Sequence, residues 1–274
     1  MPRWYITGVC FKMKKYLFFL SALVLFAFSS CQKYAGNPIT KDFYIEGSYT
    51  ELQVEDAFDV TVSDDATQIT ITAGENVMPN VVVEIVDNTL KIYLKGWHIN
   101  RGADMTVILP YNPDLTSVDL SGASEFHSEY GLEGQKVEVE LSGAADFYCD
   151  VVADEIDMEA SGASSINGNV TATDLDLELS GASNATLMGQ VNKLDIELSG
   201  ASDIKKTVEG GRYGLVCDQC EGSMSGSCNA YIHCDGRICV DLSGASTLHY
   251  TGDGISSGCS TTSGGSTISG PEHP

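Results

Sequence analysis

Carboxylates that recur at a fixed spacing are the residues of this 274-residue chain best suited to chemistry. Each stands near the end of a segment in which apolar and acidic side chains alternate. The set comprises Asp119, Glu140, Glu159, Glu178, Glu197 and Asp241, and a second set two residues earlier comprises Glu138, Asp157, Asp176 and Asp195. If the segments stack, the first set forms an outward column, and several carboxylate oxygens together suit Ca²⁺. The alternative is a solvated acidic face that keeps a flat sheet soluble and blocks lateral sheet pairing. We favour the solvated face, and the sequence predicts no cofactor.

A serine follows two residues after each carboxylate of the first set, within the repeated phrase Leu-Ser-Gly-Ala-Ser or a close variant. These serines are Ser121, Ser142, Ser161, Ser180, Ser199 and Ser243. Nucleophilic catalysis needs one serine beside a base, and the phrase lacks the strand–turn–helix context of a hydrolase. The column of equivalent serines therefore predicts hydroxyl groups that hydrogen-bond along stacked turns, and not a nucleophile.

Histidines and basic residues offer no stronger signal for catalysis. No HxH or HExxH pair occurs, although His233 and His249 fall in equivalent strands of adjacent repeats, where a contact is conceivable. We favour surface positions for both. A polysaccharide lyase would place a basic residue near carboxylate-held calcium, and the Lys and Arg residues of 116–270 do not recur in register with the acidic sets. We predict that the protein is not an enzyme, and a polysaccharide-acting enzyme remains the least favoured alternative.

Cysteines cluster late in the chain, at 217, 220, 228, 234, 239 and 259. Cys239 lies two residues before Asp241, and Cys259 has the same place one repeat later. Stacked equivalents lie about 5 Å apart, within the Cα range of a disulfide, so we predict a Cys239–Cys259 bond. The spacing of Cys217 and Cys220 would also suit zinc or redox chemistry, but no second CxxC follows, and structural disulfides are favoured.

The repeated phrase sets the architecture that must position these residues. From Ser121 onward its first serines follow one another at steps of 21, 19, 19, 19, 26, 18 and 20 residues. A period near 20 indicates a solenoid whose repeats bury their apolar faces by stacking. Apolar–acidic alternation indicates strands, glycine suits the corners, and no helical period appears. We predict an all-β, single-stranded parallel β-helix with rungs of about 19–20 residues. The long step at 203–224 predicts an irregular loop, the best place for a functional surface.

Residues 43–115 lack the phrase but still indicate β structure. Candidate strands are 49–54, 58–62, 68–73, 81–86, 89–93 and 105–109. Because a β-helix needs its open end covered, we expect this part to be a β-rich N-terminal cap. It would form one continuous domain with the repeats of 116–274.

The N-terminal residues 1–31 are interpreted as a lipoprotein signal peptide. Lys12, Lys14 and Lys15 precede an apolar run at 16–28, which is too short to span a bilayer. Phe28-Ser29-Ser30-Cys31 then resembles a bacterial lipobox, so we expect Cys31 to be acylated and 32–42 to form a tether. The alternative is an ordinary signal peptide cut nearby, and translation starts at Met1 or Met13.

The charge balance excludes nucleic acid as a partner. The formal net charge is −23, and 1–31 hold four basic and no acidic residues, so the mature chain carries −27. Such a surface repels nucleic acid and anionic headgroups. Membrane contact is therefore expected through the lipid anchor alone, because two or more acyl chains hold stably.

The chain resembles a known family over roughly 43–250. The resemblance rests on Val-Glu-Asp-Ala-Phe-Asp-Val-Thr-Val at 54–62, Gly-Glu-Asn-Val at 74–77, Asn-Thr-Leu-Lys-Ile at 88–92 and the Leu-Ser-Gly-Ala-Ser repeats. The family is the putative auto-transporter adhesin, head GIN domain, a domain of unknown function common in Bacteroidetes. The resemblance implies a β-helical fold and a lipoprotein setting, and it carries no catalytic or binding residues.

These observations predict an exported, outer-membrane lipoprotein of the cell envelope that binds a glycan or a protein without catalysis. One alternative is a structural or self-associating envelope component that joins through its weakly apolar C-terminal rung at 255–268. Oligomeric state is left open by the sequence.

Overall fold

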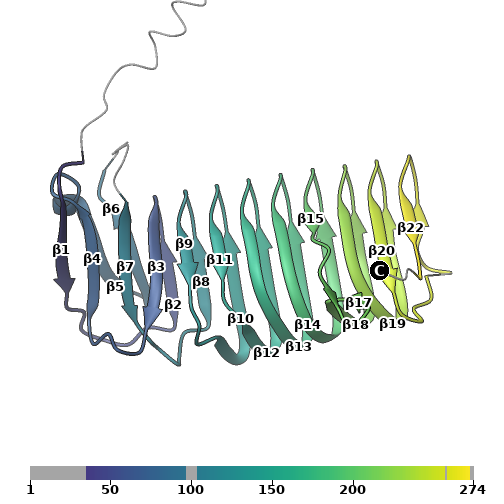
Figure 1. Cartoon of the computed structure of the whole chain (residues 1–274), viewed down its shortest axis with the longest axis horizontal. Coiled ribbons are helices and arrows are strands. Elements are labelled where there is room, and N and C mark those ends of the chain that lie inside the picture. The colour runs from purple at the N-terminus through teal and green to yellow at the C-terminus, as the bar shows by residue number, and fades with distance from the viewer. Residues whose placement is uncertain (1–34, 97–103, 257, 272–274) are drawn as a thin grey trace, which may run out of the picture.

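The computed structural model describes residues 35–96, 104–256 and 258–271 (Figure 1). The predicted signal peptide and Cys31 lie outside the described residues. The described chain holds 22 strands and one short 3₁₀ helix, η1 (Met78–Asn80), and 20 of the strands form one mixed sheet. The predicted all-β class is therefore confirmed. None of the described helices has the length and apolar character needed to cross a membrane.

The strands that precede the turn of each repeat form one line and pair side by side in parallel, in chain order. They are β8 (Ser117–Leu120), β10 (Leu132–Leu141), β12 (Val151–Ala160), β13 (Ser165–Leu179), β14 (Asn184–Leu198), β18 (Leu215–Met224), β19 (Asn229–Leu242) and β21 (Thr261–Thr262). Figure 1 shows them as a row along the long axis of the molecule. Apolar residues alternate inward along each strand, and this alternation fixes the register because a one-residue slip would turn every apolar side chain outward.

A second line of strands follows the turn in each repeat. It contains β9 (Glu125–His127), β11 (Asp146–Tyr148), the first residues of β13, β14 and β19, and β15 (Asp203–Ile204), β20 (Thr247–Thr251) and β22 (Thr267–Ser269). These strands also pair in parallel. The two lines enclose one contiguous apolar core, in which Phe126 and Phe147 stack with ring centroids 5.6 Å apart.

The N-terminal strands fall where the sequence predicts them, with small differences at their ends. They are β2 (Glu51–Val54), β3 (Phe58–Ser63), β4 (Ile69–Gly74), β5 (Val81–Val86), β6 (Thr89–Leu94) and β7 (Met105–Pro110). β2 and β3 pair in parallel with β8 and β9, whereas β4 pairs with β7 and β5 with β6 in antiparallel fashion. An additional strand, β1 (Pro38–Phe43), pairs antiparallel with β4. The tether predicted over 32–42 therefore overlaps this strand from residue 38, because the backbone of β4 offers it a free edge.

The extra residues of the long step at 203–224 form a short hairpin, where the sequence predicted an irregular loop. After β15 the extra residues form a small hairpin of β16 (Val208–Glu209) and β17 (Arg212–Tyr213), and β18 then resumes the regular pairing. Tyr213 is fully buried and packs edge-on against Tyr231 with centroids 5.4 Å apart. Cys217 and Cys220 lie beside the insertion, on β18, and both are buried in the core.

Candidate functional site

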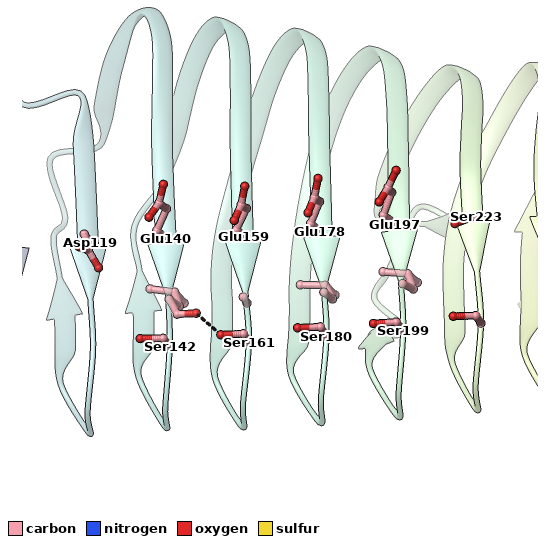
Figure 2. A pocket seen from close by; sticks show the side chains of 15 residues that line it. Asp119, Glu140, Ser142, Glu159, Ser161, Glu178, Ser180, Glu197, Ser199 and Ser223 are labelled. Atoms are coloured by element: carbon pink, nitrogen blue, oxygen red, sulfur yellow. Dashed lines mark hydrogen bonds between the residues drawn. The ribbon is translucent and has the colours of Figure 1, made fainter.

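The carboxylate and serine columns line one outward groove of about 380 Å³. Its walls include the carboxylates Asp119, Glu140, Glu159, Glu178 and Glu197 and the serines Ser142, Ser161, Ser180, Ser199, Ser223 and Ser225. Figure 2 shows the carboxylates in one line across successive strands, continued by Ser223, and Ser142, Ser161, Ser180 and Ser199 in a second line below them. Both face outward because each carboxylate and its serine stand two residues apart around a buried residue, such as Leu179 between Glu178 and Ser180.

The register changes the predicted carboxylate column at one end. Glu140, Glu159, Glu178 and Glu197 are consecutive partners, and Asp119 precedes them. Asp241, however, does not stand beside Glu197. Ser223 of β18 lies between them, and Asp241 instead accepts hydrogen bonds from the backbone N–H and hydroxyl of Thr261 at 3.1 and 2.7 Å. Asp241 therefore keeps its place in the column but is separated from the other carboxylates, because the strand after the insertion supplies a serine between them.

The two acidic columns have different electrostatic surroundings. In the earlier column, the Lys136 ammonium lies 3.0 Å from a Glu138 oxygen and 2.6 Å from an Asp157 oxygen, and Lys193 pairs with Asp195 at 3.7 Å. Within the described part of the chain, no salt bridge reaches the five carboxylates of the groove. The groove thus concentrates negative charge, which Lys91 offsets in part at Asp119.

This crowding changes the proton affinity of the groove. Burial, and then neighbouring carboxylates, raise the pKa of Glu140 and Glu178 above the ordinary glutamate value, and burial followed by Glu55 raises the pKa of Asp119. Across 35–96, 104–256 and 258–271, no group of three or more His, Cys, Asp or Glu side chains is arranged to hold a metal ion.

Acidification is expected to stabilise the protein through these carboxyls. The folded state, with raised pKa values, binds more protons than the unfolded chain between the ordinary carboxyl pKa and the raised values, so stability falls as pH rises through this window. We expect the melting temperature to rise as pH is lowered from about 7 to about 5. Glu178→Gln should raise stability at neutral pH by about 0.5 kcal/mol, the size of a cross-strand like-charge repulsion, and flatten the pH profile.

Glu138→Gln is the matched control, because it removes a carboxylate that Lys136 contacts at 3.0 Å. It should not stabilise the protein. Thermal unfolding of both variants across the pH range measures the difference, and equal effects would show that charge crowding in the groove is not the cause.

The two serines of each phrase have different roles, which the spacing alone did not separate. The last serine points inward: Ser124, Ser164, Ser183 and Ser202 are buried, and each hydroxyl donates to the carbonyl three residues earlier at 2.7–3.0 Å. First serines such as Ser161 and Ser180 line the groove instead. Among those that the structure describes, Ser161 donates to a backbone carbonyl, that of Leu141, at 3.3 Å. The predicted stack of turn hydrogen bonds is thus made mainly by the last serine.

The histidines do not face one another. The register places Tyr231 beside His249, with rings stacked 4.5 Å apart, and His233 beside Thr251, whose hydroxyl lies 2.8 Å from His233 Nδ1. The second ring nitrogen of His233 lies 3.2 Å from Asp235. Both histidines are partly buried and belong to a side-chain network around Tyr213. They therefore lie at the surface only in part, whereas the sequence predicted surface positions.

A second groove, of about 310 Å³, lies in the N-terminal part and was not predicted from the sequence. Its lining comes from three separated segments and includes Tyr44, Gln68, Tyr111, Asn112 and Asp114. Tyr44 is 83% exposed and Tyr111 41% exposed. Asn112 holds the wall by donating to the Tyr49 carbonyl at 2.8 Å. The arrangement presents open aromatic rings beside amide and carboxylate groups.

The Tyr111 ring is held from behind by a second aromatic side chain. It packs against Tyr130 with centroids 4.9 Å apart, and the Tyr130 hydroxyl donates to Asp64 at 2.8 Å. The sequence Pro-Tyr-Asn-Pro at 110–113 forms the part of the wall that holds Tyr111 and Asn112.

The late cysteines are arranged in register. The structure joins Cys239 and Cys259 in a disulfide with Cα atoms 5.2 Å apart, on neighbouring repeats. Cys149, Cys217, Cys220, Cys228 and Cys234 are buried thiols. Cys228 takes the place of an inward serine, with its sulfur 3.1 Å from the Ser225 carbonyl oxygen.

Comparison with known proteins gives one family and several similar folds. A family model described as "putative auto-transporter adhesin, head GIN domain" matches residues 48–169 and again 153–254. A putative adhesin from Parabacteroides merdae ATCC 43184 is similar with a TM-score of 0.74 and 18% identity, over 86% of this chain and 96% of that chain. A putative adhesin from Parabacteroides distasonis ATCC 8503 has a TM-score of 0.71 and 19% identity, over 85% and 98%.

A putative lipid binding protein from Parabacteroides distasonis ATCC 8503 is also similar, with a TM-score of 0.68 and 20% identity over 85% and 96% of the two chains. At these identities the likeness to solved structures shows the fold alone. No match was found among curated proteins.

Proposed function

The chain belongs to the putative auto-transporter adhesin, head GIN domain family, and from this membership we propose that it is a non-enzymatic, lipid-anchored binding protein of the cell envelope whose ligand is a glycan. The observation that carries the proposal is the tyrosine-lined groove of the N-terminal part. Tyrosine supplies a large, rigid, amphipathic contact surface at low entropic cost, and polar groups beside an aromatic wall can fix the orientation of a bound ring.

Removal of one aromatic ring from the groove wall is expected to weaken glycan binding. In a glycan array probed with the purified protein, Tyr111→Ala should reduce signal at every bound glycan by about tenfold, which corresponds to the loss of one aromatic hot spot. Tyr148→Ala is the matched control, because Tyr148 is a similarly exposed tyrosine that does not line this groove. Equal binding by the two variants, or no bound glycan at all, would contradict the proposal.

We propose further that the stacked repeats wind as a single-stranded parallel β-helix. Support comes from partners that stand 19 residues apart over several repeats, such as Glu159 with Glu178 and Glu178 with Glu197, and from the two parallel strand lines. Residues 43–115 would then cap its N-terminal end, where antiparallel strands occupy the edge. Small-angle scattering should show an elongated monomer, and a compact particle would count against this winding.

Attachment to the membrane is proposed to occur through Cys31. Cys31→Ser is expected to abolish metabolic labelling with a radioactive fatty acid and to release the protein from the membrane fraction into the soluble fraction, because the acyl chains supply the attachment. Cys10→Ser, a change elsewhere in the leader, should leave both unaffected. Retention of Cys31→Ser in the membrane fraction would show that another element holds the protein there.

Self-association is the second candidate role, and one observation favours it. Ile255 is 64% exposed near the C-terminal end of the sheet, and the last strands there, β21 and β22, leave one edge open. An open edge templates pairing with another chain. Concentration-dependent size in analytical ultracentrifugation, reduced by Ile255→Lys, would support association over glycan binding as the main role.

A further inference from the structure

Two buried cysteines stand directly opposite one another in the core. Cys217 of β18 is the register partner of Cys234 of β19, and both side chains are fully buried. The relation is the same as that between Cys239 and Cys259, which also occupy equivalent places on neighbouring repeats. In-register partners on adjacent strands lie about 5 Å apart, inside the Cα range of unstrained disulfides.

The sulfur atoms of this pair interact in the folded chain. A hydrogen bond with Cys220, the largest effect, raises the pKa of the Cys217 thiol, and the bond with Cys217 together with burial raises that of Cys234. Strand pairing independently places Cys217 and Cys234 side by side in the core. The local register also shifts after Cys217, because β19 contains one more residue than β18 before Arg237 meets Gln219. This irregularity lies next to Cys217, where the backbone can adjust to bring the two sulfur atoms to bonding distance.

Among the residues that the structure describes, Cys220 and Cys228 lack such an opposite cysteine. Cys220 is the register partner of Leu194 on one side and Ile238 on the other. Cys228 stands in the line of inward serines, with its sulfur 3.6 Å from the Ser202 hydroxyl. A shared metal ion is not the explanation for the cluster, since no group of described side chains is arranged to hold one.

We propose that Cys217 and Cys234 form a second disulfide between neighbouring repeats when the protein folds under oxidising conditions. The oxidant is a disulfide-bearing carrier, either an envelope thiol–disulfide oxidoreductase or oxidised glutathione. The thiolate of one cysteine attacks a carrier sulfur, which releases one carrier thiol and forms a mixed disulfide. The thiolate of the other then attacks the protein sulfur, so that Cys217–Cys234 forms and the second carrier thiol leaves. The protein pair loses two electrons and two protons, and the carrier disulfide gains them.

The bond must form before the core closes. The thiolate is the attacking species in exchange, and the folded environment disfavours it at both positions. Fully buried sulfur atoms are also out of reach of a carrier. Addition of oxidant to a chain already folded under reducing conditions is therefore expected to yield much less of the bond than oxidation during refolding.

Peptide mapping tests the pairing. The denatured, reduced chain is refolded in a glutathione redox buffer, free thiols are alkylated under denaturing conditions, and the chain is cut before aspartate and after glutamate. These cuts fall before Asp218 and after Glu221, and so separate Cys217, Cys220 and Cys234. The expected result is a Cys217 peptide linked to the peptide that holds Cys234, with Cys149, Cys220 and Cys228 alkylated. Fragmentation of the linked peptide distinguishes Cys234 from Cys228.

The Cys239–Cys259 bond serves as the internal reference. If it forms while Cys217 and Cys234 are alkylated, or if Cys217 is linked to Cys220, the inference is overturned. Absence of both bonds in the glutathione buffer overturns it as well. The same map of protein isolated from cell envelopes tests the proposed location separately. If both bonds form in the buffer but are absent from the envelope protein, export to an oxidising compartment is contradicted and the pairing is not.

A pair of substitutions in the same core provides the matched control. Cys217→Ser should leave Cys234 alkylated and lower the melting temperature relative to wild type, and the difference should vanish when both proteins are refolded in excess reductant. Cys220→Ser, an equally buried change three residues away, should retain the Cys217–Cys234 link. A linked, unalkylated Cys234 in Cys217→Ser, or an alkylated Cys217 and Cys234 in Cys220→Ser, would rule the pairing out, and the wild-type map decides the matter if Cys217→Ser does not fold.

Discussion

Gly181→Ala is expected to destabilise the protein by about 3 kcal/mol, at the upper end of the cost of backbone strain in folded proteins. Gly181 has φ +73°, a left-handed conformation that L side chains rarely adopt, and an added Cβ would lie 2.6 Å from the carbonyl oxygen of Gly162. That same oxygen accepts a hydrogen bond from the Ala182 N–H at 2.7 Å. The methyl group therefore forces apart two turns that the backbone hydrogen bond holds together.

Gly211→Ala separates the two contributions to this cost. Gly211 also has a left-handed conformation, with φ +82°, but no heavy atom lies within 4 Å of an added Cβ. It should cost about 1 kcal/mol, the conformational strain alone. Urea unfolding midpoints of the two variants, compared with wild type, measure the difference. Equal losses would show that close stacking of the turns contributes nothing.

The turn at Gly181 also positions the groove, because Ser180 lies immediately before it on the groove wall. Strand pairing on either side of each turn sets the spacing of the serine and carboxylate columns.

The repeats were predictable from the sequence because their information is local and repeated. Alternation of apolar and acidic residues specifies which side chains face inward, and a step of 19 residues with no insertion makes Glu159 and Glu178 partners without further information. Cys239 and Cys259 follow the same logic across a step of 20 residues. The strand positions of the N-terminal part could also be predicted, since turn residues bound each apolar run.

The irregular step could not be resolved in this way. A step of 26 residues contains extra chain, but periodicity does not say whether it precedes or follows the next strand. The structure places it before, as the hairpin of β16 and β17, so that β18 contributes Ser223 to the carboxylate column and Cys217 to the core. Tyr213 is buried against Tyr231, and this packing decides the placement through a tertiary contact that local pattern does not encode.

The tyrosine-lined groove was missed for a similar reason. Its wall joins residues near 44, 68 and 111, which antiparallel pairing of β1 with β4 and of β4 with β7 brings together. These pairings are non-local and occur once, so no periodic signal announces them. The roles of the two serines in each phrase likewise depend on the left-handed glycine between them, which turns the second serine inward.

Phe147→Ala is expected to cost about 4 kcal/mol, because it removes a fully buried aromatic ring from a core that cannot collapse freely. The Phe147 ring is 0% exposed and stacks on Phe126 at a centroid distance of 5.6 Å, with the planes tilted by 10°. Its other register partner is Ile166. The side chain thus bridges three successive repeats, and its loss leaves a cavity whose walls belong to strands held in place by their own ladders of hydrogen bonds.

Tyr148→Ala is the control at the adjacent position of the same strand, β11. Its ring is 37% exposed and faces outward, so its removal should change stability by about 0.5 kcal/mol or less. Urea and thermal unfolding of the two variants give the comparison. A loss at Tyr148 as large as that at Phe147 would mean that the inward and outward faces of β11 are misassigned.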